Sequence, residues 1–160
     1  MRYRCNSFSQ PITIVGERRS VMPIKKKKPT ENFQNSNLKR RADQGDAEAQ
    51  YLLGGLYDIG QDVSKDYAQA RQWWKKAASQ GHAEAQYLMG GLHDIGHGVP
   101  QGYAKARQWY EKAADQGHAG AQYNLGVLYA EGLGVPLDTK KARELFEKAD
   151  AQRYAESRAA

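Results

Sequence analysis

The chain has few of the residues that would build a disulfide-stapled, metal-binding or membrane-spanning protein. Among its 160 residues there is one cysteine, Cys5, so no disulfide can form within the chain. A metal site built from several cysteines is excluded for the same reason. No segment approaches the roughly 18 consecutive apolar residues of a membrane-spanning helix, so the sequence predicts no membrane segment.

The first residues also lack the features of a secretion signal. The longest early run of largely apolar residues is 12–15, whereas a signal needs about 7–15 apolar residues in a row. The pair Arg18 and Arg19 has no apolar stretch behind it, which argues against a twin-arginine signal. We therefore expect a cytoplasmic protein, with Met22 as an alternative start to Met1.

An excess of one charge is missing from most of the chain. The net charge of +6 comes from residues 1–36, which hold eight Lys/Arg and two Asp/Glu. Residues 37–160 hold 16 basic and 16 acidic side chains, so they have no bulk field to attract nucleic acid or an anionic membrane. Residues 1–36 are polar, basic and without periodicity, and we expect them to form a disordered tail.

What the chain does contain is an internal repeat. The phrase Gly-x-Ala-x-Ala-Gln-Tyr begins at Gly45, Gly81 and Gly117, with a spacing of 36 residues each time. A fixed period of this length is typical of solenoid proteins, in which each unit packs on its neighbours. The pattern divides the chain into a partial cap over 37–44, repeats over 45–80, 81–116 and 117–152, and a partial repeat over 153–160.

Each repeat predicts two helices. The first runs from Ala47 to about Asp58 in the first repeat, and its apolar residues have the spacing of a buried helical face. Those residues are Ala49, Leu52, Leu53, Leu56 and Tyr57.

The second helix begins at residues that can cap a helix N-terminus or permit its start, namely Asp66, Gly102 and Asp138. Its predicted buried face sets large residues against small ones, which lets neighbouring helices interlock. The members are Ala70, Trp73, Trp74 and Ala77, then Ala106, Trp109, Tyr110 and Ala113, then Ala142, Leu145, Phe146 and Ala149.

Besides the glycine that opens the phrase, glycines recur at two further positions of every repeat. Those inside the first helix cost about 1 kcal/mol each relative to alanine, so we expect close approach of a neighbouring helix there. Those after the first helix stand where a left-handed residue ends a helix. The two sets are Gly54, Gly90 and Gly126, and Gly60, Gly96 and Gly132.

With these motifs the chain resembles the Sel1-like repeat proteins, relatives of the tetratricopeptide repeats. The resemblance rests on Ala-Glu-Ala-Gln-Tyr-x-x-Gly-x-Leu, Gly-x-Gly-Val-Pro and Lys-Ala-Arg-x-Trp-Tyr-x-Lys-Ala-Ala-x-Gln-Gly, from about Asn37 onward. It implies an all-α fold, a right-handed α-solenoid of antiparallel helix pairs. It also implies a non-catalytic adaptor or scaffold that binds another protein or a peptide segment.

In a solenoid of helix pairs, the first helices line the concave surface. Their residues turned away from the core form a ladder of tyrosines with small and acidic neighbours, and tyrosine is favoured at binding surfaces. The alternative is that these tyrosines pack between adjacent repeats. The predicted partner-binding residues are Glu48, Tyr51, Gly55, Asp58, Glu84, Tyr87, Gly91, Asp94, Tyr123 and Val127.

The sequence nominates no chemistry, and we predict no cofactor. His93 and His97 are four residues apart but lack a third ligand, so no metal site is predicted. The glycine pairs follow helices and not strands, unlike a dinucleotide-binding loop, and no nucleophile motif indicates an enzyme. The alternatives to an adaptor are an immunity-type or host-interaction protein, nucleic-acid contact through the basic tail, and self-association through the C-terminal end.

Overall fold

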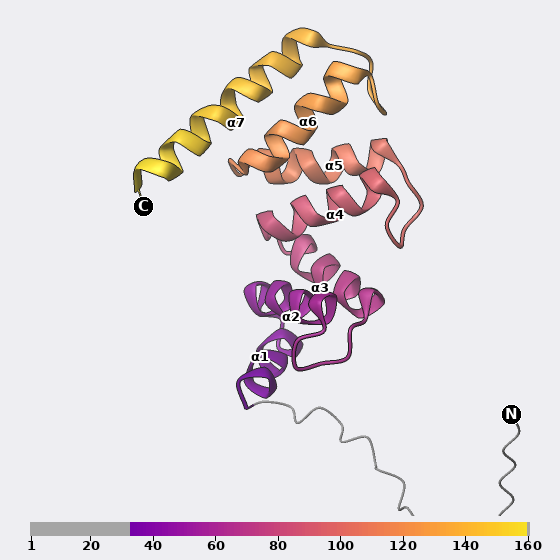
Figure 1. Cartoon of the computed structure of the whole chain (residues 1–160), viewed down its shortest axis with the longest axis vertical. Helices are drawn as coiled ribbons and strands as arrows, with labels where there is room; N and C mark the ends of the chain where they lie inside the picture. Colours follow the sequence, from indigo (N-terminus) through magenta and orange to yellow (C-terminus); the bar gives the residue numbers. More distant parts are fainter. Residues whose placement is uncertain (1–32, 160) are drawn as a thin grey trace, which may run out of the picture.

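The computed structural model describes residues 33–159, with side chains from 36 to 153. This part of the chain is entirely helical apart from turns (Figure 1). The helices are α1 Phe33–Asp43, α2 Ala47–Ile59, α3 Tyr67–Ser79, α4 Ala83–Ile95, α5 Tyr103–Ala114, α6 Ala119–Glu131 and α7 Thr139–Ala159.

The helices form three pairs, α2–α3, α4–α5 and α6–α7, and the pairs stack along the long axis of the molecule (Figure 1). Each helix packs chiefly on the helices that precede and follow it in the chain. Nearest-neighbour packing of this kind defines a solenoid, in which every repeat buries its apolar side against the next. The all-α solenoid predicted from the 36-residue period is confirmed.

The two helices of a pair approach closely because the first helix carries a glycine under an aromatic ring. A Cβ atom added to Gly54 would lie 2.5 Å from the Trp74 ring, and one added to Gly90 would lie 2.5 Å from the Tyr110 ring. Phe146 occupies the same place over Gly126. The expectation that these glycines admit a neighbouring helix is therefore confirmed, and the neighbour is the second helix of the same repeat.

The ends of the helices follow the predicted capping residues. Gly60, Gly96 and Gly132 end α2, α4 and α6 with φ of 75°, 74° and 68°, and each donates its backbone N–H to the last turn. At the start of α3 and α7, the carboxylates of Asp66 and Asp138 accept backbone N–H groups. Gly102 begins α5 without a side-chain cap.

A row of buried glutamines joins successive repeats. Gln50 donates to the carbonyl of Ala42 at 3.0 Å, and its Oε1 accepts from Gln80 at 2.7 Å. Gln86 repeats both contacts one repeat later, with the carbonyl of Ala78 and the amide of Gln116. In Gln50 and Gln86 the side-chain nitrogen and the side-chain oxygen are both hydrogen-bonded, so burial leaves neither without a partner. These contacts tie each helix pair to the next.

The structure differs from the sequence prediction at the C-terminal end. Residues 153–159 continue α7 as one helix, whereas a turn and the first helix of a fourth repeat were expected. Arg153 stands where Gly81 and Gly117 make that turn with φ of 95° and 84°, a conformation that L side chains rarely adopt. Because α7 does not end there, Gln152 makes no bond to the buried Oε1 of Gln122, which has no partner among the described residues. Self-association through this end stays a prediction.

The N-terminal boundary and parts of the predicted core also differ. Helix α1 begins at Phe33, so residues 33–36 are helical, and the rest of the predicted tail lies outside the described residues. Leu52 was expected in the core but is 44% exposed. Trp109 and Phe146 are half-buried, while the other members of the predicted second-helix face are buried. For Leu52 the reason is that α2 packs mainly on α1 and α3, which leave this side chain largely uncovered.

The neighbouring glycines Gly54 and Gly55 allow a matched test of the close helix approach. Gly54→Ala should lower the free energy of unfolding by about 1–3 kcal/mol, because the added methyl group overpacks against Trp74. Gly55→Ala should leave stability unchanged or raise it by up to about 1 kcal/mol, because its Cβ would meet nothing within 4 Å and alanine favours helix. Urea unfolding followed by circular dichroism measures both, and equal effects would contradict the packing argument.

Candidate protein-binding surface

The exposed side of the first helices holds most of the predicted partner-binding residues. Glu48 projects from α2 with 58% of its side chain exposed. Gly55, about two helical turns further along, leaves open space where a side chain would stand. Gly91 and Val127 occupy the same position in α4 and α6, and both are half-buried. A Cβ atom at Gly91 would lie 3.8 Å from the Tyr110 hydroxyl of α5, so the open space is clearest at Gly55.

The three tyrosines of the ladder differ in their surroundings: two pack between adjacent repeats, and one is largely exposed. Tyr51 and Tyr87 are half-buried, and each stacks on a histidine of the next repeat, His82 and His118, with ring centroids 4.7 and 4.6 Å apart. Tyr123 has no such histidine and is 55% exposed. The first two tyrosines therefore help to join repeats, whereas the third packs one side of its ring against Phe146, with centroids 5.2 Å apart, and exposes the rest.

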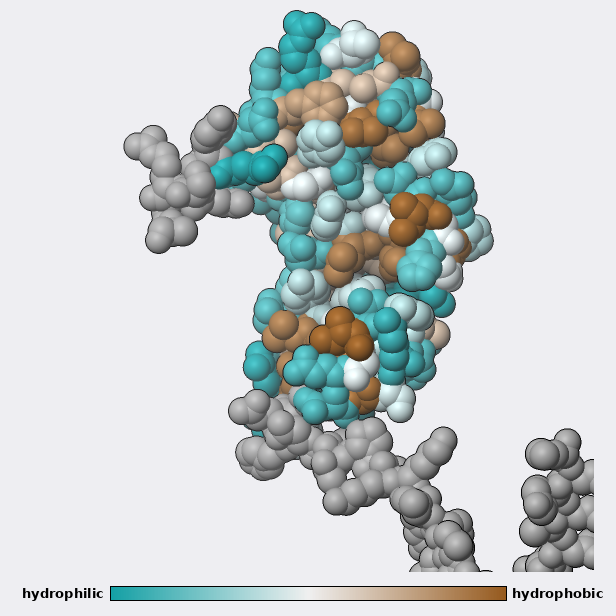
Figure 2. All heavy atoms as spheres, in the orientation of Figure 1, coloured by the Kyte–Doolittle hydropathy of each residue, from teal (hydrophilic) through white to brown (hydrophobic). Residues whose placement is uncertain are grey.

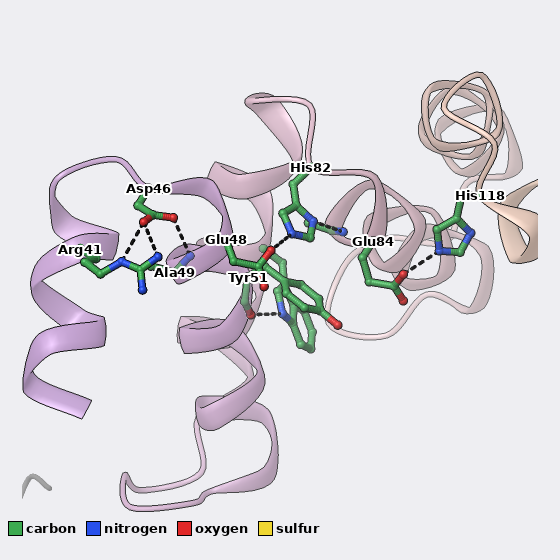
Figure 3. A network of polar contacts seen from close by, with 10 residues as sticks. Arg41, Asp46, Glu48, Ala49, Tyr51, His82, Glu84 and His118 are labelled. Atoms are coloured by element: carbon green, nitrogen blue, oxygen red, sulfur yellow. Dashed lines mark hydrogen bonds and ion pairs between the residues drawn. The ribbon is translucent and has the colours of Figure 1, made fainter. Parts of the chain in front are cut away.

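His82 and His118 make the same polar contacts at two successive repeat junctions (Figure 3). In each, Nε2 lies within 2.9 Å of a glutamate from the preceding first helix, Glu48 or Glu84. Nδ1 accepts the backbone N–H of the third residue of the helix that the histidine caps, at 3.2 and 3.1 Å. Each histidine thus caps its own helix and binds the previous one.

These two contacts assign the tautomer of His82 and His118. Nδ1 must be unprotonated to accept the backbone N–H, so the proton lies on Nε2 and is donated to the glutamate. A doubly protonated ring would bring a second N–H toward the helix N-terminus and could not cap it. The neutral ring therefore satisfies both partners at once.

The first repeat has Asp46 at the capping position instead of a histidine. Its carboxylate accepts from Ala49 N–H at 3.0 Å and from the Arg41 guanidinium at 2.8 and 2.6 Å (Figure 3). The backbone N–H of Ala49 and the Arg41 guanidinium hold the pKa of Asp46 below its usual value. The ionised carboxylate is thus favoured in the folded state, so its contribution to stability is present above the usual aspartate pKa and is lost as the pH falls.

The third repeat breaks this pattern and leaves a cavity. Gly120 stands where Glu48 and Glu84 stand in the earlier repeats, and no capping histidine follows Tyr123. A cavity of about 410 Å³ opens here between α4, α6 and α7. Its lining combines aromatic, amide and charged side chains: Tyr87, Tyr123, Asn124, Asp150 and Arg153.

The two predicted aspartates lie at the far end of their helices. Asp94 accepts a hydrogen bond from the Tyr110 hydroxyl at 3.2 Å, and Asn124 donates to the same hydroxyl at 3.1 Å. Burial raises the pKa of Tyr110, so the phenol stays protonated and can keep donating to Asp94. Asp58 lies beside Arg71 and Trp74 at the edge of a small cavity of about 20 Å³. Asp94 is therefore held between helices, whereas Asp58 faces the inter-helix loop.

Several exposed residues of this side were missed in the sequence. Leu52, Ile59 and Ile95 are 44%, 60% and 70% exposed on α2 and α4, and Asn124 takes the position of Leu52 in α6. Figure 2 shows apolar residues of the surface in small separate groups among hydrophilic ones. The periodicity of α2 could not reveal Leu52, because its spacing fits a buried face equally well.

The described residues show no arrangement of titratable side chains that could hold a metal ion. His93 lies near the carbonyl of Pro100, and His97 contacts the Tyr67 ring edge-on. Within residues 33–159, no helix has the length and apolar character needed to cross a membrane. The cytoplasmic location stays a prediction, and the nucleic-acid contact predicted for the basic tail concerns residues outside the described part, apart from 33–36.

The profile of the Sel1 repeat matches residues 47–82, 83–118 and 119–149. The chain belongs to the Sel1 repeat family. Proteins built from Sel1 repeats are generally protein-interaction scaffolds, and the family is typically non-catalytic. A comparison with curated protein sequences gives no match.

Solved structures with Sel1-type folds are similar to this chain. A Sel1 repeat protein from Oxalobacter formigenes is 37% identical with a TM-score of 0.72, over 78% of this chain and 96% of that protein. The uropathogenic Escherichia coli protective antigen c5321 is 44% identical with a TM-score of 0.70, over 73% of this chain and 25% of the antigen. The immunity protein Pa5087 from Pseudomonas aeruginosa is 26% identical with a TM-score of 0.53, over 71% of this chain and 44% of that protein.

Substitutions of His82 separate its capping contact from its other contacts. His82→Ala should lower the free energy of unfolding by about 1–2 kcal/mol, because α4 loses its cap and Tyr51 loses its stacked ring. His82→Asn should recover about 1 kcal/mol of that loss, because asparagine is a good N-cap. Urea unfolding measures both variants, and identical losses would show that the cap contributes nothing.

Proposed function

We propose that this Sel1 repeat protein is a non-catalytic adaptor that binds a segment of a partner protein on the exposed side of α2, α4 and α6. This surface is called the first-helix face below. The observation that carries the proposal is the combination of open space at Gly55 with an exposed Tyr123 beside a cavity of about 410 Å³. Concave surfaces lined by repeated helices are the usual binding surfaces of solenoids.

The chemistry of the first-helix face favours a partner segment with both apolar and basic side chains. The exposed apolar residues Leu52, Ile59 and Ile95 can receive apolar side chains, and Tyr123 adds a large ring with a hydrogen-bonding hydroxyl. Glu48 and Glu84 each direct one carboxylate oxygen to a histidine and keep about half of their side-chain surface exposed. These carboxylates favour basic groups on the partner through charge complementarity.

The tyrosines Tyr51 and Tyr87 enter this proposal in a different way from Tyr123. Because each stacks on a histidine, we propose that they shape the floor of the first-helix face and keep adjacent repeats at a fixed distance. Tyr123 is the one that we expect a partner to cover. Asp58 and Asp94 mark the loop end of the face.

An immunity-type role is a second candidate, supported by the similarity to the immunity protein Pa5087 from Pseudomonas aeruginosa. In that case the partner on the first-helix face would be a folded toxin in place of a peptide segment. The two candidates share the surface and differ in the partner, so one set of variants tests both.

A matched pair of arginine substitutions tests the first-helix face. Gly55→Arg should block partner binding, because the new side chain would project into open space on this face without a clash in the protein. Gln108→Arg adds the same side chain and charge at an exposed position of α5, on a second helix. The partner is first captured from a lysate of the source cells, and its affinity for each protein is then measured by calorimetry. We expect the dissociation constant to rise at least about 10-fold for Gly55→Arg and to stay unchanged for Gln108→Arg.

The same measurement can overturn the proposal. Circular dichroism should first establish that both variants keep the helical content and unfolding midpoint of the unaltered protein. If the partner binds the unaltered protein and both variants equally, its binding site is not on the first-helix face. If only Gln108→Arg loses affinity, the binding site is on the second helices.

A further inference from the structure

A second groove lies between the second helices α3 and α5, away from the first-helix face. It encloses about 360 Å³ and has part of α4 as its floor. Three permanent cations line it: Arg71 and Lys75 from α3, and Lys105 from α5. Met89, Val99 and Trp109 supply an apolar part of the wall. This site is called the cationic groove below.

The three cations of the cationic groove have no counter-charge. No aspartate or glutamate lines the groove. In the described part of the chain, the side chains of Arg71, Lys75 and Lys105 make no hydrogen bond or ion pair. Asp58 shares a small neighbouring cavity with Arg71 but forms no ion pair with it. Like charges held around one cavity repel one another, and an anion placed between them removes that repulsion.

The next repeat provides an internal comparison, because the same positions recur between α5 and α7. There Arg107 pairs with Glu111 at 3.1 Å, whereas Arg71 has Lys75 at the position of Glu111. Lys141, which corresponds to Lys105, donates to the Tyr129 hydroxyl at 2.8 Å and lies over the Tyr129 ring.

His93 takes the position of Tyr129 in the cationic groove, so Lys105 has no hydroxyl partner there. Two differences, at positions 75 and 93, thus turn a groove whose Arg107 and Lys141 have internal partners into one whose cations have none. The repeat fold does not require these free cations, since it forms without them one repeat later.

We propose that the cationic groove binds an acidic segment of a partner protein, with carboxylates on Arg71, Lys75 and Lys105 and one apolar side chain against Met89 and Trp109. A cavity of about 360 Å³ is large enough for one or two side chains of such a segment. An arginine can bind a carboxylate through two parallel hydrogen bonds, which gives the contact direction as well as strength. The proposal concerns a different surface from the first-helix face and holds or fails independently of it.

The observations favour an acidic peptide over nucleic acid. Nucleic-acid binding needs an extended basic surface that follows many phosphates. Residues 37–160 carry equal numbers of basic and acidic side chains, and Arg71, Lys75 and Lys105 gather around one cavity of limited volume. A short acidic segment with an apolar side chain matches both the charge and the apolar wall.

The test uses the full chain and a defined peptide in which one leucine is flanked by two glutamates on each side. A second peptide has glutamine in place of every glutamate. The acidic peptide is added stepwise and followed by proton–nitrogen correlation spectra. It should shift the resonances of the α3 and α5 amides and of the Trp109 indole. The glutamine peptide should bind at least about 10-fold more weakly, because charge-assisted hydrogen bonds are lost.

Lys75→Glu is the decisive variant, because it recreates the Arg107–Glu111 arrangement that the chain already tolerates. It should weaken binding of the acidic peptide at least about 10-fold. The matched control Lys148→Glu makes the same charge change at an exposed position of α7 outside the groove and should change affinity less than about 2-fold. Gly55→Arg should also leave this affinity unchanged, which separates the groove from the first-helix face.

Four results would overturn the proposal. One is no binding of the acidic peptide at millimolar concentration. Another is equal weakening by Lys75→Glu and Lys148→Glu, which would indicate a general charge effect. The third is that the shifted amides lie on α2, α4 and α6. The last is that a single-stranded oligonucleotide binds the groove and displaces the peptide, which would make the groove a nucleic-acid site.

Discussion

The contact between an aromatic ring and a glycine inside each repeat sets the geometry on which the rest of the molecule depends. Trp74, Tyr110 and Phe146 rest on Gly54, Gly90 and Gly126, at distances that leave no room for a Cβ atom. This contact brings the two helices of a pair together and fixes their relative position. The capping turns, the buried glutamines and the exposed side of the first helices all follow from repeating that unit three times.

The junctions between repeats use polar contacts where the repeats themselves use packing. Gln50 and Gln86 each donate to a backbone carbonyl of the preceding helix and accept from a glutamine, Gln80 or Gln116, that follows the second helix of their own repeat. His82 and His118 cap one first helix and bind a glutamate of the previous one. A solenoid is stabilised by the sum of its repeats and its junctions, so these contacts are where neighbouring units become cooperative. They also fix the spacing of the first-helix face.

Both candidate binding surfaces include a place where the repeat pattern is broken. At the third repeat, Gly120 and the missing histidine leave Tyr123 exposed beside a cavity. Between α3 and α5, Lys75 and His93 replace the residues Glu111 and Tyr129, which bond the cations of the next groove. Departures from the pattern leave a side chain without the partner that other repeats supply, the stacked histidine for Tyr123 and the Glu or Tyr partner for the cations, and such groups are available to bind another molecule.

The sequence by itself determined the 36-residue period, the helix pairs, the left-handed glycines at the helix ends and the close approach at Gly54, Gly90 and Gly126. These features are local or periodic, and capping and glycine conformations depend on a few neighbouring residues. The continuation of α7 also has a local cause, since Arg153 replaces a left-handed glycine.

Only the tertiary structure decided which predicted surface residues are exposed. Tyr51 and Tyr87 are covered by histidines that lie 31 residues later in the chain, and Tyr123 is not. The cationic groove likewise combines residues of three helices, and its lack of a carboxylate is visible only when α3 and α5 lie side by side. Exposure and charge balance depend on what the next repeat places opposite each side chain, which the periodic pattern alone does not specify.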